Sequence, residues 1–252
     1  MAHATLMTDM VAPVSTPTIV PEAAKSLAER YAAFAQARVE RRRTDPAIRT
    51  LDVAISVGAL LLFVPIAVLV ALAVRLSAGP PVFYRGPRVG RAGHVFTMVK
   101  FRTLVPDAES RLGPYWGGEL DRRTRSEVTA LGRWLRATQL DEVPQLWNVL
   151  RGDMSLVGPR PIRPAFFEQL CDEIPQYWQR LVVRPGLTGL AQTRIGREPS
   201  WGEKLAHDLE YVADRSVRLY LRVVSATAWR VVRQSGGGVT QLLGSGKRGT
   251  AT

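Results

Sequence analysis

An uncharged and almost wholly apolar segment, residues 53–74, constrains this chain more than any other feature. An apolar helix of roughly 20 residues is long enough to cross the hydrocarbon core of a bilayer, so a single transmembrane helix is the first interpretation. Pro65 lies in the middle of the segment. A proline inside a helix removes one backbone hydrogen bond and clashes with the preceding turn, so the sequence predicts a membrane helix that is broken or kinked at Pro65.

Basic residues flank the apolar segment on both sides. The run 41–43 and Arg49 precede it, and Arg75, Arg85, Arg88 and Arg91 follow it. Basic residues next to a membrane helix favour the cytoplasmic side, so we expect both ends of the segment there. A re-entrant helix, which breaks at Pro65 and returns to the leaflet that it entered, satisfies both observations. A kinked helix that spans the bilayer remains the alternative.

The charge and cysteine content narrow the class of protein. The chain has 252 residues and a formal net charge of +12, which favours anionic partners such as nucleic acid, anionic lipid or a phosphorylated substrate. This length suffices for one domain with a core and an anchor. Cys171 is the single cysteine, so an internal disulfide framework is excluded.

Four regions follow along the chain. Residues 1–46 are rich in Ala, Thr and Pro and carry the basic run, which predicts a disordered, basic N-terminal extension that contacts anionic headgroups. Residues 47–78 form the predicted re-entrant helix, and residues 79–234 form the domain that carries the motifs. Residues 235–252 are rich in Gly and Ser, which predicts a flexible tail.

The region 79–234 predicts a mostly helical α+β fold. Segments 82–85 and 94–102 are expected to form a short β-hairpin, with Lys100 and Arg102 on one face of its second strand. A solvated edge explains this pair of cations equally well. Helical segments are expected at 128–137, with Leu131, Trp134 and Leu135 inward, and at 164–183, interrupted at Pro175. Residues 105–127 predict a loop or a short surface helix.

The segment 216–233 mixes apolar and basic side chains. This composition predicts an amphipathic helix in the membrane interface. A core helix with a basic outer face is the alternative.

The stretch 140–161 organises the candidate chemistry. Val143, Leu146, Trp147 and Leu150 have helical spacing, which predicts a helix that begins near Asp141 and ends at Gly152. Asp141 and Glu142 then lie at the positive end of the helix dipole. An ordinary N-cap is one explanation for this pair.

A fixed loop with an arginine follows this helix. Pro159 and Pro161 stiffen the backbone of Arg160, so its guanidinium is presented at low entropic cost. A rigid arginine near two carboxylates and a helix N-terminus suits a phosphate ligand together with a metal ion. The whole stretch therefore favours a phosphate site over capping alone.

Several strings occur in a fixed order along the chain. They are Gly-Pro-Pro-Val-Phe-Tyr at 79–84, Arg-Val-Gly at 88–90, Lys-Phe-Arg-Thr at 100–103, the Asp-Glu stretch, Pro-Arg-Pro at 159–161 and the loop 184–192. Over roughly residues 49–232 the chain resembles the bacterial sugar transferase family, the monotopic phosphoglycosyl transferases, also called polyprenyl-phosphate hexose-1-phosphate transferases. The family helix breaks at a Ser-Pro pair, where this chain has Val64 and Pro65.

The resemblance implies a fold and a reaction. The fold is a monotopic membrane protein with a re-entrant helix, a hairpin, interfacial helices and a catalytic domain on the cytoplasmic face of the bacterial inner membrane. The reaction transfers a sugar-1-phosphate from a UDP-sugar to polyprenyl (undecaprenyl) phosphate and releases UMP. It is the first membrane step of exopolysaccharide or other surface glycan assembly.

The resemblance also implies roles for individual residues. Asp141 is expected to form a phosphoryl-aspartate intermediate, and Glu142 with Asp141 is expected to hold Mg²⁺ against the diphosphate. Phosphate-binding cations are expected at Lys100, Arg102, Arg136, Arg160 and Arg197. Tyr220 stands where the family usually has Asp.

Two other functions are weighed against this one. A catalytically inactive, basic scaffold protein of glycan assembly would require a broken Asp-Glu pair, and the pair is intact. A nucleic-acid binder would require aromatic and basic residues interleaved in a binding motif, which the sequence does not show. Nucleic acid is therefore not an expected partner, and homo-oligomerisation is left open.

Overall fold

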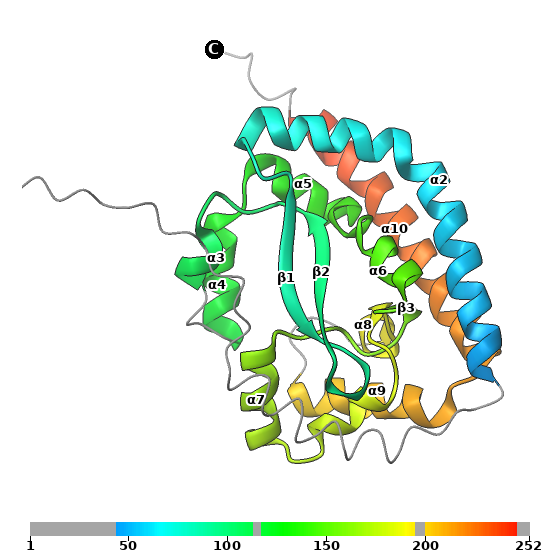
Figure 1. Ribbon diagram of the computed structural model, residues 1–252. Helices are drawn as coiled ribbons and strands as arrows, with labels where there is room; N and C mark the ends of the chain where they lie inside the picture. The colour runs from blue at the N-terminus through cyan, green and yellow to red at the C-terminus, as the bar shows by residue number, and fades with distance from the viewer. Residues whose placement is uncertain (1–43, 113–116, 195–199, 246–252) are drawn as a thin grey trace, which may run out of the picture.

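The computed structural model describes residues 44–112, 117–194 and 200–245. Figure 1 shows a β-hairpin near the centre, with α2 and α10 along one side and α7 and α9 at the loop end of the hairpin. The predicted fold class, mostly helical with a short β-hairpin, is confirmed. The predictions for residues 1–43 lie outside the described residues.

The elements follow in this order. The α-helices are α2 (Thr44–Ala78), α3 (Ala108–Leu112), α4 (Gly117–Glu127), α5 (Ala130–Thr138), α6 (Gln145–Arg151), α7 (Pro164–Glu173), α8 (Leu190–Arg194), α9 (Trp201–Asp214) and α10 (Val217–Ser245). The 3-10 helices are η1 (Arg91–Gly93), η2 (Leu140–Glu142) and η3 (Tyr177–Val182). The strands are β1 (Phe83–Val89), β2 (Val95–Phe101), β3 (Ser155–Val157) and β4 (Gly186–Thr188).

The helix α2 carries the apolar segment. It is long and apolar enough to cross a membrane by length and composition. Leu61, Leu62, Leu69 and Leu76 are 66–77% exposed, which is unusual for large apolar side chains in water. Pro65 lies inside a helix that stays continuous, so the predicted break is corrected to a bend, which Figure 1 shows in the middle of α2. The re-entrant path through a bilayer stays a prediction.

The predicted hairpin is confirmed. Strands β1 and β2 pair antiparallel, and the register places Tyr84 opposite Lys100 and Arg88 opposite Phe96. A second sheet, in which β3 and β4 pair in parallel, was not predicted. It brings Gly186 so close to Gly158 that a Cβ on Gly186 would lie 2.1 Å from the Gly158 backbone nitrogen. Only glycine fits where these two chain segments meet.

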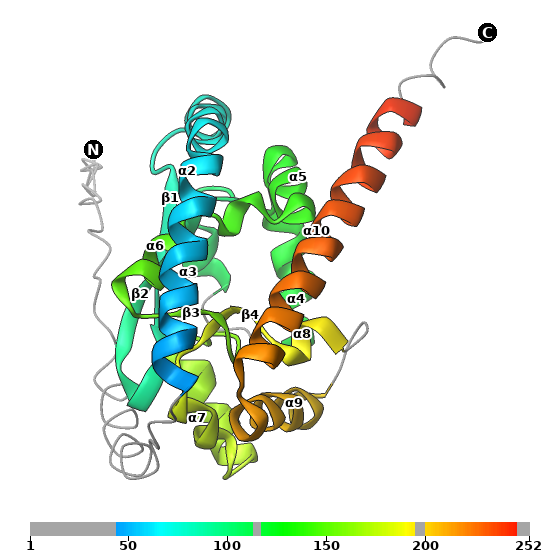
Figure 2. The ribbon, with the colours of Figure 1, turned by 90° about the vertical axis from the view of Figure 1, so that its right-hand side faces the viewer.

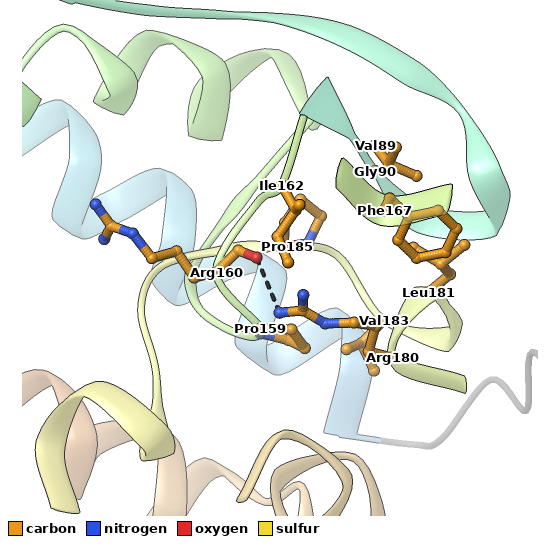
Figure 3. A pocket seen from close by; sticks show the side chains of 10 residues that line it. All are labelled: Val89, Gly90, Pro159, Arg160, Ile162, Phe167, Arg180, Leu181, Val183 and Pro185. Carbon is orange, nitrogen blue, oxygen red and sulfur yellow. Dashed lines mark hydrogen bonds between the residues drawn. The ribbon is translucent and has the colours of Figure 1, made fainter. Parts of the chain in front are cut away.

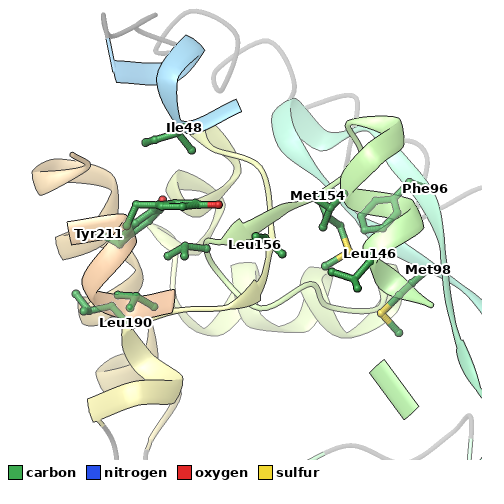
Figure 4. Packing of buried hydrophobic residues seen from close by; sticks show 12 residues of the cluster. Ile48, Phe96, Met98, Leu146, Met154, Leu156, Leu190 and Tyr211 are labelled. Carbon is green, nitrogen blue, oxygen red and sulfur yellow. The ribbon is translucent and has the colours of Figure 1, made fainter. Parts of the chain in front are cut away.

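One core cluster joins the elements that position the site. Figure 4 shows Leu146 and Met154 beside Phe96 and Met98, with Leu156 between this group and the side of α9. The cluster therefore packs β2, α6 and β3 together, and α2 and α10 contribute to it through buried side chains. A second cluster lies under α7, η3 and α9 and contains Phe167 and Leu170 of α7.

Two features differ from the sequence prediction, and one predicted alternative is confirmed. Trp134 is 40% exposed, although helical spacing predicted it as inward, and Trp147, which shares the predicted apolar helix face with Leu146, is 56% exposed. The helix α10 continues to Ser245, so residues 235–245 are helical rather than a flexible tail. Extending an existing helix adds a hydrogen bond for each residue that is fixed, which offsets the weak helix propensity of glycine. Within the segment 105–127, residues 108–112 form α3 and residues 117–127 form α4, as the alternative of a surface helix predicted.

Candidate active site

The Asp141 carboxylate is buried between α5 and α6. Gln139 adopts a left-handed conformation with φ of 57°, which ends α5 and turns the chain into η2. Asp141 is only 5% exposed. The helix predicted from Asp141 begins in fact as this 3-10 turn, and α6 follows from Gln145. Its predicted end at Gly152 is confirmed, where φ is 92°.

Three cations face Asp141. Burial raises the pKa of the Asp141 carboxyl to about 6, and the neighbouring charge of Glu142 acts in the same direction. Lys100, Arg136 and Arg160 act in the opposite direction because each favours the ionised carboxylate. The structure therefore brings together five of the predicted site residues. They come from β2, α5, η2 and the loop after β3.

Lys100 is held against the face of the hairpin. Its Nζ lies 5.1 Å from the centroid of the Tyr84 ring, directly across the two strands. Burial lowers the pKa of the Lys100 ammonium to about 8, Asp141 opposes this change, and Arg88, Arg136 and Arg160 add to it. Arg88 also stacks near the Tyr84 ring, at 5.8 Å.

The sequence prediction missed Tyr84 and Arg88. Alternation along β1 places both on the face that carries Lys100, which is the signal that could have found them. A Cβ on Gly86 would lie 2.1 Å from the Tyr84 hydroxyl oxygen, so glycine makes room for that ring.

Arg136 joins α5 to the end of the hairpin. Its Nε donates to the Thr103 hydroxyl at 2.9 Å. The Thr103 carbonyl accepts from the Thr129 backbone N–H at 3.0 Å, where Thr129 caps α5. A Cβ on Gly132 would lie 2.1 Å from this same carbonyl oxygen, so α5 approaches the strand end at a glycine. These contacts fix the position of Arg136 relative to Lys100.

Arg160 completes the cation cluster from a braced loop. Its Nη2 donates to Glu142 Oε1 at 2.9 Å. The backbone carbonyl of Arg160 accepts from Arg180 Nη2 at 2.9 Å, as Figure 3 shows, while its side chain extends away from Arg180. Arg180 is in turn paired with Asp208 of α9 at 2.7 Å, and both side chains are 5% exposed. The buried pair therefore holds the backbone of the Pro159–Pro161 loop.

The helix α6 is fixed to the hairpin by Asn148. Its Oδ1 accepts from the Val99 backbone N–H at 3.0 Å, and its Nδ2 donates to the Thr97 carbonyl at 2.8 Å. The buried face of α6 therefore contains a polar residue, and Trp147 lies outside it. An apolar-periodicity argument could not find this face because it treats asparagine as a surface residue.

Arg102 is a correction to the predicted set. Its guanidinium donates to the carbonyls of Gly79 at 2.6 Å and Pro80 at 2.9 Å, and also to that of Ala78. Arg102 therefore caps the C-terminal end of α2 and does not join the cations that face Asp141. It follows the last residue of β2, so its side chain is no longer held to the face that carries Lys100.

Comparison with known proteins decides the family. The sequence model described as "Bacterial sugar transferase" matches residues 43–234. The chain belongs to the bacterial sugar transferase family. Its matched region begins with α2 and contains the whole of the described Asp141 cluster.

Several curated members of the sugar transferase family are similar to this chain. The UDP-glucose:undecaprenyl-phosphate glucose-1-phosphate transferase of Caulobacter vibrioides is 39% identical over 71% of this chain and 67% of its own length. The exopolysaccharide production protein ExoY of Rhizobium meliloti is 38% identical over 71% of this chain and 82% of its own length. The undecaprenyl-phosphate galactose phosphotransferase of Salmonella typhimurium is 34% identical over 75% of this chain. The chain spans only 41% of that last relative.

The carboxylates of this sugar transferase fit the predicted metal. Mg²⁺ in phosphate sites typically binds one or two carboxylates, and phosphate oxygens and water supply the other ligands. Asp141 and Glu142 are such a pair, and in the described part of the chain no group of three or more potential ligands gathers. The Mg²⁺ site stays a prediction. Arg197 lies outside the described residues.

A buried carboxylate links the membrane helix of this sugar transferase to the site. Asp52 of α2 is 1% exposed and accepts from Ser155 Oγ at 3.0 Å, the Leu156 backbone N–H at 2.9 Å and the Tyr220 hydroxyl at 2.9 Å. This network joins α2, β3 and α10. It also gives Tyr220, where the family usually has Asp, a structural role as a hydrogen-bond donor to Asp52.

Proposed function

We propose that this chain transfers a sugar-1-phosphate from a UDP-sugar to undecaprenyl phosphate and releases UMP. The observation that carries the proposal is the buried Asp141 carboxylate beside Glu142 and three cations. The names of the Caulobacter and Salmonella relatives support an undecaprenyl phosphate acceptor. The name of the Rhizobium relative supports a place in exopolysaccharide production.

The proposed reaction has two steps. The Asp141 carboxylate attacks the phosphorus that carries the sugar, an aspartyl–phosphorus bond forms, and the bond to the UMP oxygen breaks with its electron pair leaving on UMP. A phosphate oxygen of the acceptor then attacks the same phosphorus and displaces Asp141 as a carboxylate. The product is the polyprenyl-diphosphate sugar, and the enzyme is regenerated.

The cations stabilise the charge that moves during both steps. Lys100, Arg136 and Arg160 face the Asp141 carboxylate and would contact the oxygens of the diphosphate. Phosphoryl transfer depends mainly on positioning and on such charge stabilisation. When bound between Asp141, Glu142 and the diphosphate, Mg²⁺ would neutralise further negative charge.

The apolar helix α2 explains why such a site belongs at a membrane. An undecaprenyl chain does not leave the bilayer, so the carboxylate that serves it must lie at the bilayer surface. We propose that α2 anchors the domain to the inner membrane with the site on the cytoplasmic face, where UDP-sugars are found.

Substitution of the nucleophile tests the proposal. In Asp141→Asn the amide is a poor nucleophile, so we expect UMP release from a UDP-sugar to be abolished while membrane association is retained. Asp172→Asn makes the same chemical change at an exposed position on α7 and is expected to keep full activity. Full activity in Asp141→Asn would remove the nucleophile assignment.

The intermediate can be tested separately. With a UDP-sugar labelled at the sugar-linked phosphate and no acceptor present, acid quenching is expected to leave label on the protein. The label should be absent from Asp141→Asn and should disappear from the unmodified protein when undecaprenyl phosphate is added. The alternative function, an inactive scaffold, predicts donor binding without UMP release.

A further inference from the structure

A large apolar groove lies between α2, α5 and α10. Its cavity volume is about 1130 Å³, at the upper end of the range for small-molecule sites. Figure 2 shows α2 and α10 on either side with α5 between them. The apolar lining residues include Ile55, Ala59 and Phe63 of α2, and Val224, Ala228 and Val231 of α10.

One end of the groove meets the candidate active site. Glu142 and Arg160, which are joined at 2.9 Å, both line it, and Leu140 and Val143 lie beside them in the lining. A ligand in the groove would therefore place an anionic head next to Arg160 and Glu142. Glu142 directly follows Asp141 in the chain, so this head would lie near the Asp141 carboxylate. The Arg160 guanidinium can bind a phosphate at this end, because its side chain is 59% exposed and therefore accessible to a ligand.

Large apolar side chains are also exposed on α2 and α10 outside the groove. Leu61 and Leu62 of α2 are 72% and 70% exposed, and Trp229 of α10 is 70% exposed. The groove is therefore flanked by surfaces suited to hydrocarbon rather than to water. A ligand with a long apolar chain can lie between these helices without exposing that chain to solvent.

We infer that this groove binds the isoprenoid chain of the acceptor and presents the acceptor phosphate at the Arg160 end. The inference rests on the proposed function. It adds the place where the acceptor binds and the helices, α2, α5 and α10, whose residues contact its chain. A single chain with one anionic head matches a groove whose lining is mostly apolar and which has Arg160 at the end beside Asp141. Arg133 and Arg230 also line the groove, but their guanidinium groups donate to the carbonyls of Val128 and Gln192.

The groove can be filled from its walls. Ala59→Trp on α2 and Ala228→Trp on α10 place a large ring in the groove at positions away from Asp141. We compare kcat/KM for undecaprenyl phosphate with kcat/KM for geranyl phosphate, a short acceptor, in the full chain in nanodiscs. The ratio of the long to the short acceptor is expected to fall at least about tenfold, because each methylene that loses burial weakens binding several-fold.

A matched control makes the result specific. Leu61→Trp introduces the same ring on the exposed side of α2, outside the groove, and is expected to leave the ratio unchanged. An unchanged ratio in both groove variants would overturn the inference. UMP release by the unmodified protein with either acceptor tests the proposed function by itself, so the two failures are distinguishable.

A measurement on the unmodified protein guards against misfolded variants. Undecaprenyl phosphate with a photoreactive group in its chain is expected to label peptides that contain residues 55–63 and 224–232, at groove positions such as Phe63. Labelling confined to outward residues such as Leu61, Leu62 and Trp229 would overturn the inference. So would labelling of the groove by photoreactive phosphatidylglycerol that undecaprenyl phosphate does not displace, because the groove would then hold bulk lipid.

Discussion

Lys100 is a cation whose charge changes within the ordinary range of assay pH. Its pKa is lowered from 10.5 to about 8, so it is charged below that pH and neutral above it. The charged groups that face it are Asp141, Arg88, Arg136 and Arg160. We expect the rate of UMP release to fall as the pH rises through about 8, because the ammonium that faces the diphosphate is lost.

A conservative substitution identifies the group that titrates. Arginine stays protonated at every assay pH, so Lys100→Arg is expected to remove the alkaline decline even if its maximal rate is lower. The check is a pH profile of kcat for both proteins. An identical alkaline decline in Lys100→Arg would assign the titration to another group.

Truncation of Arg102 is predicted to lower stability, whereas truncation of Arg160 is predicted to weaken binding of the UDP-sugar. Arg102 donates to carbonyls at the end of α2, so Arg102→Ala is expected to lower the free energy of unfolding by about 2 kcal/mol and to change KM for the UDP-sugar little. Arg160→Ala is expected to raise that KM about tenfold with little loss of stability, because the side chain is exposed. Denaturation in detergent and steady-state kinetics on both variants provide the check, and equal effects would contradict the correction.

The proximity of Asp141, Glu142 and Arg160 could be predicted because proline and glycine constrain the backbone of this stretch. The catalytic and binding roles of these residues stay predictions. Arg102 was misplaced because strand alternation gives the face of a side chain but not the partner that a long side chain reaches after the strand ends. Arg180 and Asp208 were missed because a buried ion pair joins segments that are distant in sequence.

At the scale of elements, α9 braces the loop that presents Arg160. Asp208→Asn would leave Arg180 buried without its counter-charge, which costs about 3–5 kcal/mol of the free energy of unfolding when a buried pair is broken. The Arg160 backbone would then lose its fixed donor, so KM for the UDP-sugar is expected to rise. Unfolding experiments and kinetics measure the two effects.

Rescue separates positioning from general instability. Asp208→Glu keeps the charge and is expected to bring KM for the UDP-sugar close to that of the unmodified protein. Asp214→Asn, at an exposed position of the same helix, is expected to change neither this KM nor the free energy of unfolding. A normal KM in a destabilised Asp208→Asn would show that the brace supports the fold alone.

Elements with a clear period were predictable, and short or mixed ones were not. The hairpin and the helix α7 were found from alternation, prolines and helical spacing. The parallel pair of β3 and β4 was missed because three residues are too few to show a period, and both strands are mostly buried. The buried face of α6 was missed because Asn148 pairs with β2.

At the scale of the whole molecule, the bend of α2 decides how the protein sits in the membrane. If α2 is re-entrant, tags at the N- and C-termini are accessible to protease from the same face of inverted vesicles. Pro65→Leu removes the helix-bending residue, so we expect α2 to straighten and the N-terminal tag to move to the opposite face. Tags on opposite faces of the unmodified protein would establish a spanning helix instead.

The long apolar helix α2 could be predicted from the sequence, while its path through a bilayer stays a prediction. The apolar segment, its central proline and its basic flanks indicated an anchor with a bend. The groove between α2, α5 and α10 could not be predicted, because it depends on the spacing of three helices that are distant in sequence.

The hydrogen bond from Arg102 to the C-terminal end of α2 connects the predicted membrane helix to the strand that carries Lys100. Arg102, two positions after Lys100, donates to the carbonyl of Ala78, the last residue of α2, and to the carbonyls of Gly79 and Pro80 that follow. A tilt of α2 would therefore pull on the strand that carries the Lys100 ammonium. Hydrophobic helices tilt to match the thickness of the surrounding hydrocarbon. If α2 anchors the domain as proposed, turnover should depend on the acyl length of the neighbouring phospholipids, so bilayer thickness would act on the proposed sugar-1-phosphate transfer.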